Sequence, residues 1–123
     1  MENRIKVVLA DANENFRTMR QQTIENTGEF DVVGSAGDGA EAWKMIERER
    51  PQLVITDVIL PELDGFGVLE LMKRRRWLEE LPVIVISAES DVSYIQRAYD
   101  LGATDFIGRP FNAAIAQWRV RNT

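Results

Sequence analysis

The 123-residue sequence contains no cysteine and no histidine. The absence of cysteine excludes disulfides, thiolate nucleophiles and cysteine-ligated metals, and the absence of histidine excludes imidazole bases and ligands. Together they remove most classes of hydrolase and zinc enzyme. A metal site in this chain would have to be built from oxygen ligands, which favours Mg²⁺ or Ca²⁺.

The sequence also lacks a long apolar segment and an excess of positive charge. No apolar run approaches the roughly 18 to 20 residues that span a bilayer, and residues 1–6 have no signal-peptide hydrophobic region. We therefore expect a cytoplasmic location and no membrane association. The net charge of −5 argues against direct nucleic-acid binding, and the basic run at 73–76 fits a helix end facing solvent.

Apolar and β-branched runs alternate along the chain with segments of helical spacing. The strands are predicted at 5–10, 31–36, 53–56, 82–86 and 104–107, and the helices at 13–27, 38–50, 65–76, 90–101 and 112–123. Asn13 and Asp38 are suited to cap the first two helices. The predicted inward faces are Phe16, Met19, Thr23 and Ile24 in the first helix, and Val92, Ile95, Ala98 and Tyr99 in the fourth.

Five strand–helix repeats with nearly continuous apolar strands predict a parallel sheet covered on both faces. Right-handed crossovers leave an open doubly wound sheet or part of a barrel, and five strands are too few for an eight-stranded barrel. We therefore predict an α/β fold with three layers, a doubly wound (βα)5 arrangement in a single domain at 1–123.

Polar residues stand at the carboxyl ends of four predicted strands: Asp11, Asp57, Ser87 and Arg109. Ligands bind at this edge of a parallel sheet. Two carboxylates suit a hard divalent cation, and a hydroxyl and a guanidinium suit phosphoryl oxygens. Each residue also has a structural explanation, as a cap, a backbone-bonded hydroxyl or a surface ion pair. Their conjunction favours a site where an aspartate accepts a phosphoryl group.

Along nearly its whole length the chain resembles the receiver domain of two-component response regulators. Four stretches carry the resemblance: 7–11 ending in Asp11, the D-x-x-x-P-x-x-D-G element from Asp57 to Gly65, 83–88 with Ser87, and 98–111 with Phe106 and the R-P-F run. The resemblance implies a flavodoxin-like fold with the parallel strand order 2-1-3-4-5.

The resemblance also implies a phosphorelay role for this edge of the sheet. Asp57 would be the phosphoacceptor, receiving its group from a histidine kinase, a phosphotransfer protein or a small phosphodonor. Asp11, Asp57 and the backbone carbonyl of Ile59 would hold Mg²⁺. The chain would then be a switch rather than an enzyme, with at most self-catalysed phosphorylation and dephosphorylation.

The switch itself would involve three further residues by the same resemblance. Ser87 and Arg109 would contact phosphoryl oxygens, and Phe106 would turn inward when the hydroxyl moves. The responding surface would comprise the fourth helix, the fifth strand and the fifth helix, near Tyr99 and Trp118.

The chain departs from the family pattern at two positions. Receivers usually carry two acidic residues after the first strand, but Ala12 follows Asp11 here, so we expect a reduced affinity for Mg²⁺. One carboxylate about 4 Å from a monovalent charge is worth roughly 4 kcal/mol at an effective dielectric near 20. Glu14 could substitute for the missing acid. Arg109 replaces the usual lysine, keeping the charge in a bulkier, planar group.

A phosphorylated switch has three alternatives. A degenerate receiver would bind partners independently of phosphorylation, and the missing second acid motivates it. An aspartate-nucleophile phosphatase would need a general acid two residues after Asp57, where Ile59 stands. A flavodoxin-like cofactor binder would need a phosphate-binding loop after the first strand, where the acidic run 11–15 would repel phosphate.

The predicted last helix is still running when the sequence stops at Thr123. The ending at 118–123 resembles the point where receivers continue into an output domain, in some cases one for cyclic-dinucleotide synthesis or hydrolysis. We therefore expect the chain to be the N-terminal part of a longer regulator, controlling a C-terminal output domain and able to form a homodimer.

Overall fold

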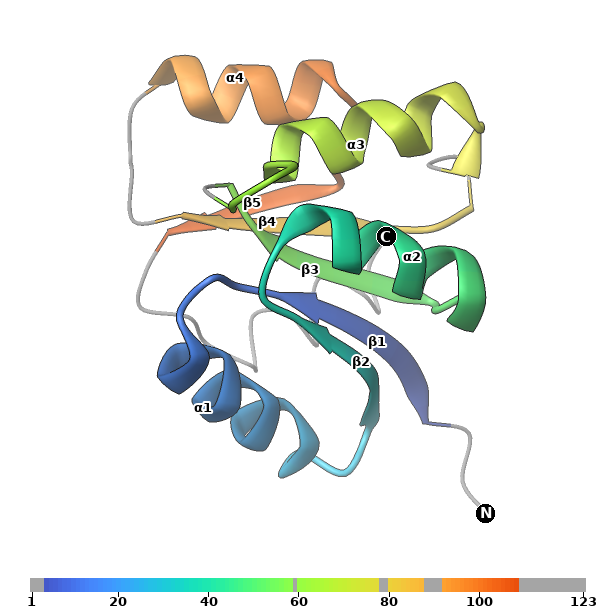
Figure 1. Cartoon of the computed structure of the whole chain (residues 1–123), viewed down its shortest axis with the longest axis vertical. Coiled ribbons are helices and arrows are strands. Elements are labelled where there is room, and N and C mark those ends of the chain that lie inside the picture. The colour runs from blue at the N-terminus through green and yellow to red at the C-terminus, as the bar shows by residue number, and fades with distance from the viewer. Residues whose placement is uncertain (1–3, 59, 78–79, 88–91, 109–123) are drawn as a thin grey trace.

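The computed structural model describes residues 4–58, 60–77, 80–87 and 92–108. Strands and helices alternate through these residues (Figure 1). The strands are β1 (Ile5–Ala10), β2 (Phe30–Ala36), β3 (Leu53–Asp57), β4 (Val83–Ser87) and β5 (Asp105–Gly108), and the helices are α1 (Glu14–Glu25), α2 (Gly39–Glu49), α3 (Gly65–Arg74) and α4 (Val92–Asp100). Each lies within about two residues of its predicted position, and the predicted helix at 112–123 lies outside the described residues.

The strands form one parallel sheet in the order β2-β1-β3-β4-β5, which confirms the predicted doubly wound topology. Ala10 of β1 pairs with Thr56 of β3, and Asp57 pairs with Ile86 of β4. The residues that follow these pairs, Asp11 and Ser87, therefore lie beside Asp57 at the carboxyl edge of the sheet.

Alternating side chains of the central strands fill two apolar layers. Val7 and Leu9 of β1 belong to the cluster that includes Ile24 of α1, whereas Val8 belongs to the cluster that includes Phe66 of α3. Helix α1 covers one face of the sheet, and α2, α3 and α4 lie on the other (Figure 1). No helix in these described ranges is long and apolar enough to cross a membrane.

The predicted inward face of α1 was correct for Ile24 and wrong for Phe16 and Met19. Phe16 and Met19 are 44% and 59% exposed, and the buried residues of α1 are Arg20 and Ile24. The helix is rotated relative to its apolar pattern because the long Arg20 side chain, rather than an apolar one, reaches the sheet edge.

The predicted inward face of α4 was wrong in part. Ala98 is fully buried as expected, but Val92 and Tyr99 are 76% and 44% exposed. Ala98 is the buried residue of α4, and Val92 at its start and Tyr99 near its end lie on the outside.

Candidate functional site

Asp11 is held at the edge of the sheet by the turn that links β1 to α1. Its backbone N–H donates to the Ala36 carbonyl at 3.1 Å, which extends the β1–β2 pairing by one residue. Its side-chain Oδ1 accepts the Asn13 N–H at 2.9 Å, and Asn13 in turn caps α1 by accepting the Phe16 N–H at 3.0 Å. This turn leaves the Asp11 residue 1% exposed.

Asp57 ends β3 and is 7% exposed. The following loop is fixed at both ends: the Val58 N–H donates to the Ile86 carbonyl at 3.3 Å, and the Gly65 N–H donates to the Val58 carbonyl at 2.8 Å. Asp64 then caps α3 by accepting the Gly67 N–H at 2.8 Å. The D-G pair of the sequence motif therefore returns the chain to the base of Asp57 and starts the next helix.

The loop after Asp57 is also attached to the start of α2. The Pro61 carbonyl accepts the Leu63 N–H at 2.7 Å and the Gly39 N–H at 3.3 Å, and Glu62 between them has a φ of 67°. A β-carbon at Gly39 would be 1.5 Å from the Leu63 carbonyl oxygen, so this contact requires glycine. The loop that follows Asp57 is therefore packed against the N-termini of α2 and α3.

The buried charge of Arg20 is the feature that the sequence analysis missed. Its side chain is 8% exposed, and Nη1 lies 2.5 Å from Oδ2 of Asp11, whose side chain is 2% exposed. One signal was available: Arg20 stands four residues before Ile24, and that spacing places two side chains on one helix face. The ion pair neutralises one carboxylate of the site from within the protein.

The other predicted site residues are only partly placed. Ser87 ends β4 and pairs in register with Gly108, but its side chain, like Ile59 and Arg109, lies outside the described residues. Phe106 is half-buried and packs against the cluster beneath α3 and α4. Glu14 is exposed in the first turn of α1, where a carboxylate complements the helix dipole.

As arranged here, the described residues do not fit a magnesium ion held by Asp11. Both of its carboxylate oxygens already contact protein donors, the Asn13 N–H and the Arg20 guanidinium. Ala12 is exposed and supplies no ligand. Among the residues with a described placement, no group of three acidic side chains could hold a metal ion. Among the described residues, the Arg20 guanidinium lies beside Asp11, where the sequence predicted a metal.

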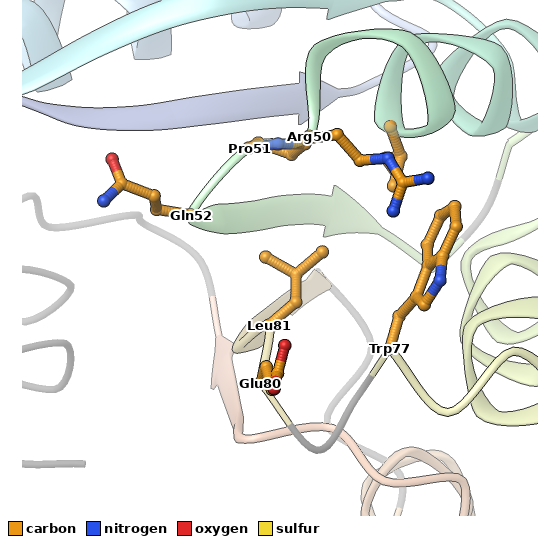
Figure 2. Close-up of a pocket in the computed structure, with 7 residues that line it drawn as sticks. Arg50, Pro51, Gln52, Trp77, Glu80 and Leu81 are labelled. Atoms are coloured by element: carbon orange, nitrogen blue, oxygen red, sulfur yellow. The ribbon is translucent and has the colours of Figure 1, made fainter.

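A separate cavity lies at the opposite, amino-terminal end of the sheet (Figure 2). It measures about 410 Å³ and is lined by Ile46, Arg50, Pro51, Gln52, Trp77, Glu80 and Leu81. Gln52 and Leu81 precede β3 and β4, so this cavity is separated from Asp57 by the length of the sheet. The Arg50 guanidinium lies 4.7 Å from the centroid of the Trp77 ring, a cation–π contact rather than a catalytic arrangement.

Comparison with known proteins gives a family match over most of the chain. A model of the response regulator receiver domain matches residues 7–119. The alkaline phosphatase synthesis transcriptional regulatory protein PhoP of Bacillus subtilis is 32% identical over 116 residues, which cover 94% of this chain and 47% of that protein. The chain spans about half the length of the curated relatives it matches.

Solved structures show the same fold. The response regulator domain of Thermotoga maritima CheB is 25% identical with a TM-score of 0.85, covering 98% of this chain and 96% of that one. A chain of the CheX-CheY-BeF3-Mg²⁺ complex from Borrelia burgdorferi is 25% identical with a TM-score of 0.82, covering 96% of this chain and 87% of that one.

Proposed function

This chain belongs to the response regulator receiver domain family, whose members are phosphoacceptor switches rather than enzymes, and we propose that Asp57 is its phosphoacceptor. The observation that carries the proposal is the position of Asp57, a carboxylate at the carboxyl end of a central strand, followed by a loop pinned at Val58 and Gly65. A fixed carboxylate suits in-line attack on phosphorus, because positioning supplies most of the catalysis in phosphoryl transfer.

The aspartyl phosphate would act as the switch. A carboxylate oxygen of Asp57 attacks phosphorus, the donor group leaves, and the resulting phosphoryl group adds charge at a buried position. Ser87 and Arg109 are the proposed contacts of its oxygens, and Phe106 the proposed aromatic that responds. The surface formed by α4 and β5 would carry the change, and exposed Val92 and Tyr99 lie on its α4 side.

Receiver domains typically bind Mg²⁺, and the Borrelia complex contains Mg²⁺ and BeF3. For this chain we propose a reduced affinity. The support is twofold: Ala12 stands where a second carboxylate is usual, and the carboxylate of Asp11 is already paired with Arg20. Asp57 and the backbone carbonyl of Ile59, which lies outside the described residues, remain proposed ligands, and exposed Glu14 is a further candidate.

Receiver domains partner with histidine kinases, and a kinase or a phosphotransfer protein is the proposed donor for Asp57. Because the chain spans about half of its curated relatives, an output domain following it in a longer regulator is also proposed. The named relative is a transcriptional regulator, and control of an output domain of that kind is part of the proposal. A cytoplasmic location and homodimer formation, with no direct nucleic-acid contact by this domain, complete the proposal.

Acetyl phosphate tests the assignment of Asp57. Incubation of the wild-type chain over a range of Mg²⁺ concentrations should give an adduct of one phosphoryl group by intact-mass spectrometry. Asp57→Asn should give none, and Asp64→Asn, which retains a helix cap, should behave as wild type. An adduct of equal yield on Asp57→Asn, or its absence from the wild-type chain at millimolar Mg²⁺, would contradict the proposal.

A phosphorylation-independent interaction module is the second candidate. Ala12 and the Asp11–Arg20 pair favour it, since both depart from a metal-assisted phosphoacceptor site. The two candidates differ in what Asp57→Asn does to binding of the output domain or another partner. The switch predicts a loss of the phosphodonor-dependent change in binding, and the module predicts no change.

A further inference from the structure

A buried guanidinium stands at the position where a receiver would hold a cation. The side chains of Arg20 and Asp11 are 8% and 2% exposed, and Nη1 lies 2.5 Å from Oδ2. Solvent and salt screen so buried a pair only weakly. Asp11 is therefore neutralised by the protein itself.

A metal ion and Arg20 would need the same oxygen. The Oδ1 atom of Asp11 accepts the Asn13 N–H, and Oδ2 faces the guanidinium. Mg²⁺ binds carboxylate oxygens at about 2.0 to 2.1 Å and keeps several waters in an octahedral shell. That shell and a guanidinium in contact with Oδ2 cannot occupy the same space, so the two cations exclude each other.

We propose that Arg20 is an internal cation of this site that competes with divalent metal ions for Asp11. A metal ion binds there only when the Arg20 side chain withdraws, and in its absence the guanidinium holds the carboxylate in place. The competition concerns the same site as the proposed function but does not depend on phosphorylation of Asp57.

Arg17 provides a matched comparison within the same helix. Its Nη1 donates to the backbone carbonyl of Asp11 at 2.8 Å, whereas Arg20 contacts the carboxylate. Arg17→Met and Arg20→Met each remove one positive charge from α1 beside the same residue. Only Arg20→Met removes a guanidinium from the Asp11 carboxylate, so the pair of variants separates competition from a general change in charge.

Isothermal titration with Mg²⁺ alone, without any phosphodonor, tests the competition. We expect Arg20→Met to bind Mg²⁺ at least about tenfold more tightly than the wild-type chain, because Mg²⁺ then has no guanidinium to displace from Asp11. Arg17→Met should stay within about twofold of wild type, because Arg20 still contacts the Asp11 carboxylate in that variant. Equal affinities in Arg20→Met and wild type, or an equal gain in Arg17→Met, would overturn the proposal.

Loss of one partner of a buried pair can unfold a small domain, so a second measurement uses the folded wild-type chain. In a Mg²⁺ titration followed by NMR, the Arg20 side-chain Nε–Hε resonance should shift together with the Asp11 amide. A shift of the Asp11 amide with an unmoved Arg20 resonance would overturn the competition. If the wild-type chain shows no response, Arg20→Gln, which keeps a hydrogen-bond donor without the charge, must respond for the proposal to stand.

These results are independent of phosphotransfer. Tighter Mg²⁺ binding by Arg20→Met with no adduct at Asp57 in any variant would support the competition and contradict the proposed function. An adduct at Asp57 with identical Mg²⁺ affinities in all variants would support the proposed function and contradict the competition.

Discussion

Gly65 lies so close to Asp57 that a β-carbon at position 65 would stand 2.4 Å from the Asp57 backbone carbonyl oxygen. That oxygen belongs to the last residue of β3, which pairs with Ile86 of β4, and it accepts the Thr56 hydroxyl at 3.0 Å. The Gly65 N–H also donates to the Val58 carbonyl at 2.8 Å. The glycine therefore fixes the start of α3 directly against the residue proposed to take the phosphoryl group.

Gly65→Ala should lower the free energy of unfolding by about 2 to 3 kcal/mol, because a methyl group is forced against backbone that cannot relax. Urea denaturation measures the loss. Gly67→Ala is the control, since its β-carbon would meet the flexible Leu63 side chain at 2.5 Å, and alanine gains up to about 1 kcal/mol in a helix. Equal stability changes in the two variants would show that the contact with Asp57 does not determine the requirement for glycine.

The sheet and its site edge were predictable because the central strands are apolar on both faces. Such strands read as unbroken runs, and the polar residue that stops each run marks the carboxyl edge of the sheet. Asp11 and Asp57 were identified in this way, and their register at the ends of β1 and β3 follows from the parallel pairing. The caps Asn13 and Asp38 were also predictable, since helices begin where these residue types stand.

The buried face of α1 could not be predicted from apolar spacing. A periodicity argument counts apolar residues only, so it placed Phe16 and Met19 inward and did not consider Arg20. Burial of Arg20 depends on a carboxylate nine positions earlier, at the end of another element, and spacing within the helix carries no information about it. The same limit applies to exposed Val92 in α4, whose neighbours are set by tertiary packing.

Arg20→Met should destabilise the fold by about 3 to 5 kcal/mol, because it removes the guanidinium paired with the buried Asp11 carboxylate. The double variant Asp11→Asn/Arg20→Met should lose less than the sum of the two single losses, since neither charge is then stranded. Arg17→Met removes one hydrogen bond to a backbone carbonyl and should cost about 1 kcal/mol. Thermal and urea unfolding of the four variants measures the coupling, and strictly additive losses would contradict it.

Tyr99→Phe should cost about 1 to 2 kcal/mol, because the Tyr99 hydroxyl donates to Oδ1 of Asp105 at 3.1 Å and that aspartate is 4% exposed. Tyr94→Phe is the matched control on the same helix. The Tyr94 ring packs edge-on against Phe66 with centroids 5.8 Å apart, a contact that phenylalanine preserves. Chemical denaturation should show a lower free energy of unfolding for Tyr99→Phe and an unchanged one for Tyr94→Phe. An unchanged free energy of unfolding in Tyr99→Phe would mean that water replaces the lost hydroxyl donor.

Ala12→Asp should restore Mg²⁺ binding in part. At an effective dielectric near 20, a carboxylate about 4 Å from a single charge contributes roughly 4 kcal/mol before desolvation, so a gain of at least about tenfold in affinity is expected. Ala12→Asn, of similar shape but neutral, should gain far less. Calorimetry is the suitable measurement, because tryptophan fluorescence would report on another region. Trp43 and Trp77 stack on each other at 5.1 Å, and Trp77 lines the cavity at the far end of the sheet.

If Arg20 still holds Asp11, the double variant Ala12→Asp/Arg20→Met should bind Mg²⁺ more tightly than either single variant. A double variant no better than Ala12→Asp would mean that the second carboxylate, and not the guanidinium, sets the metal affinity of this receiver.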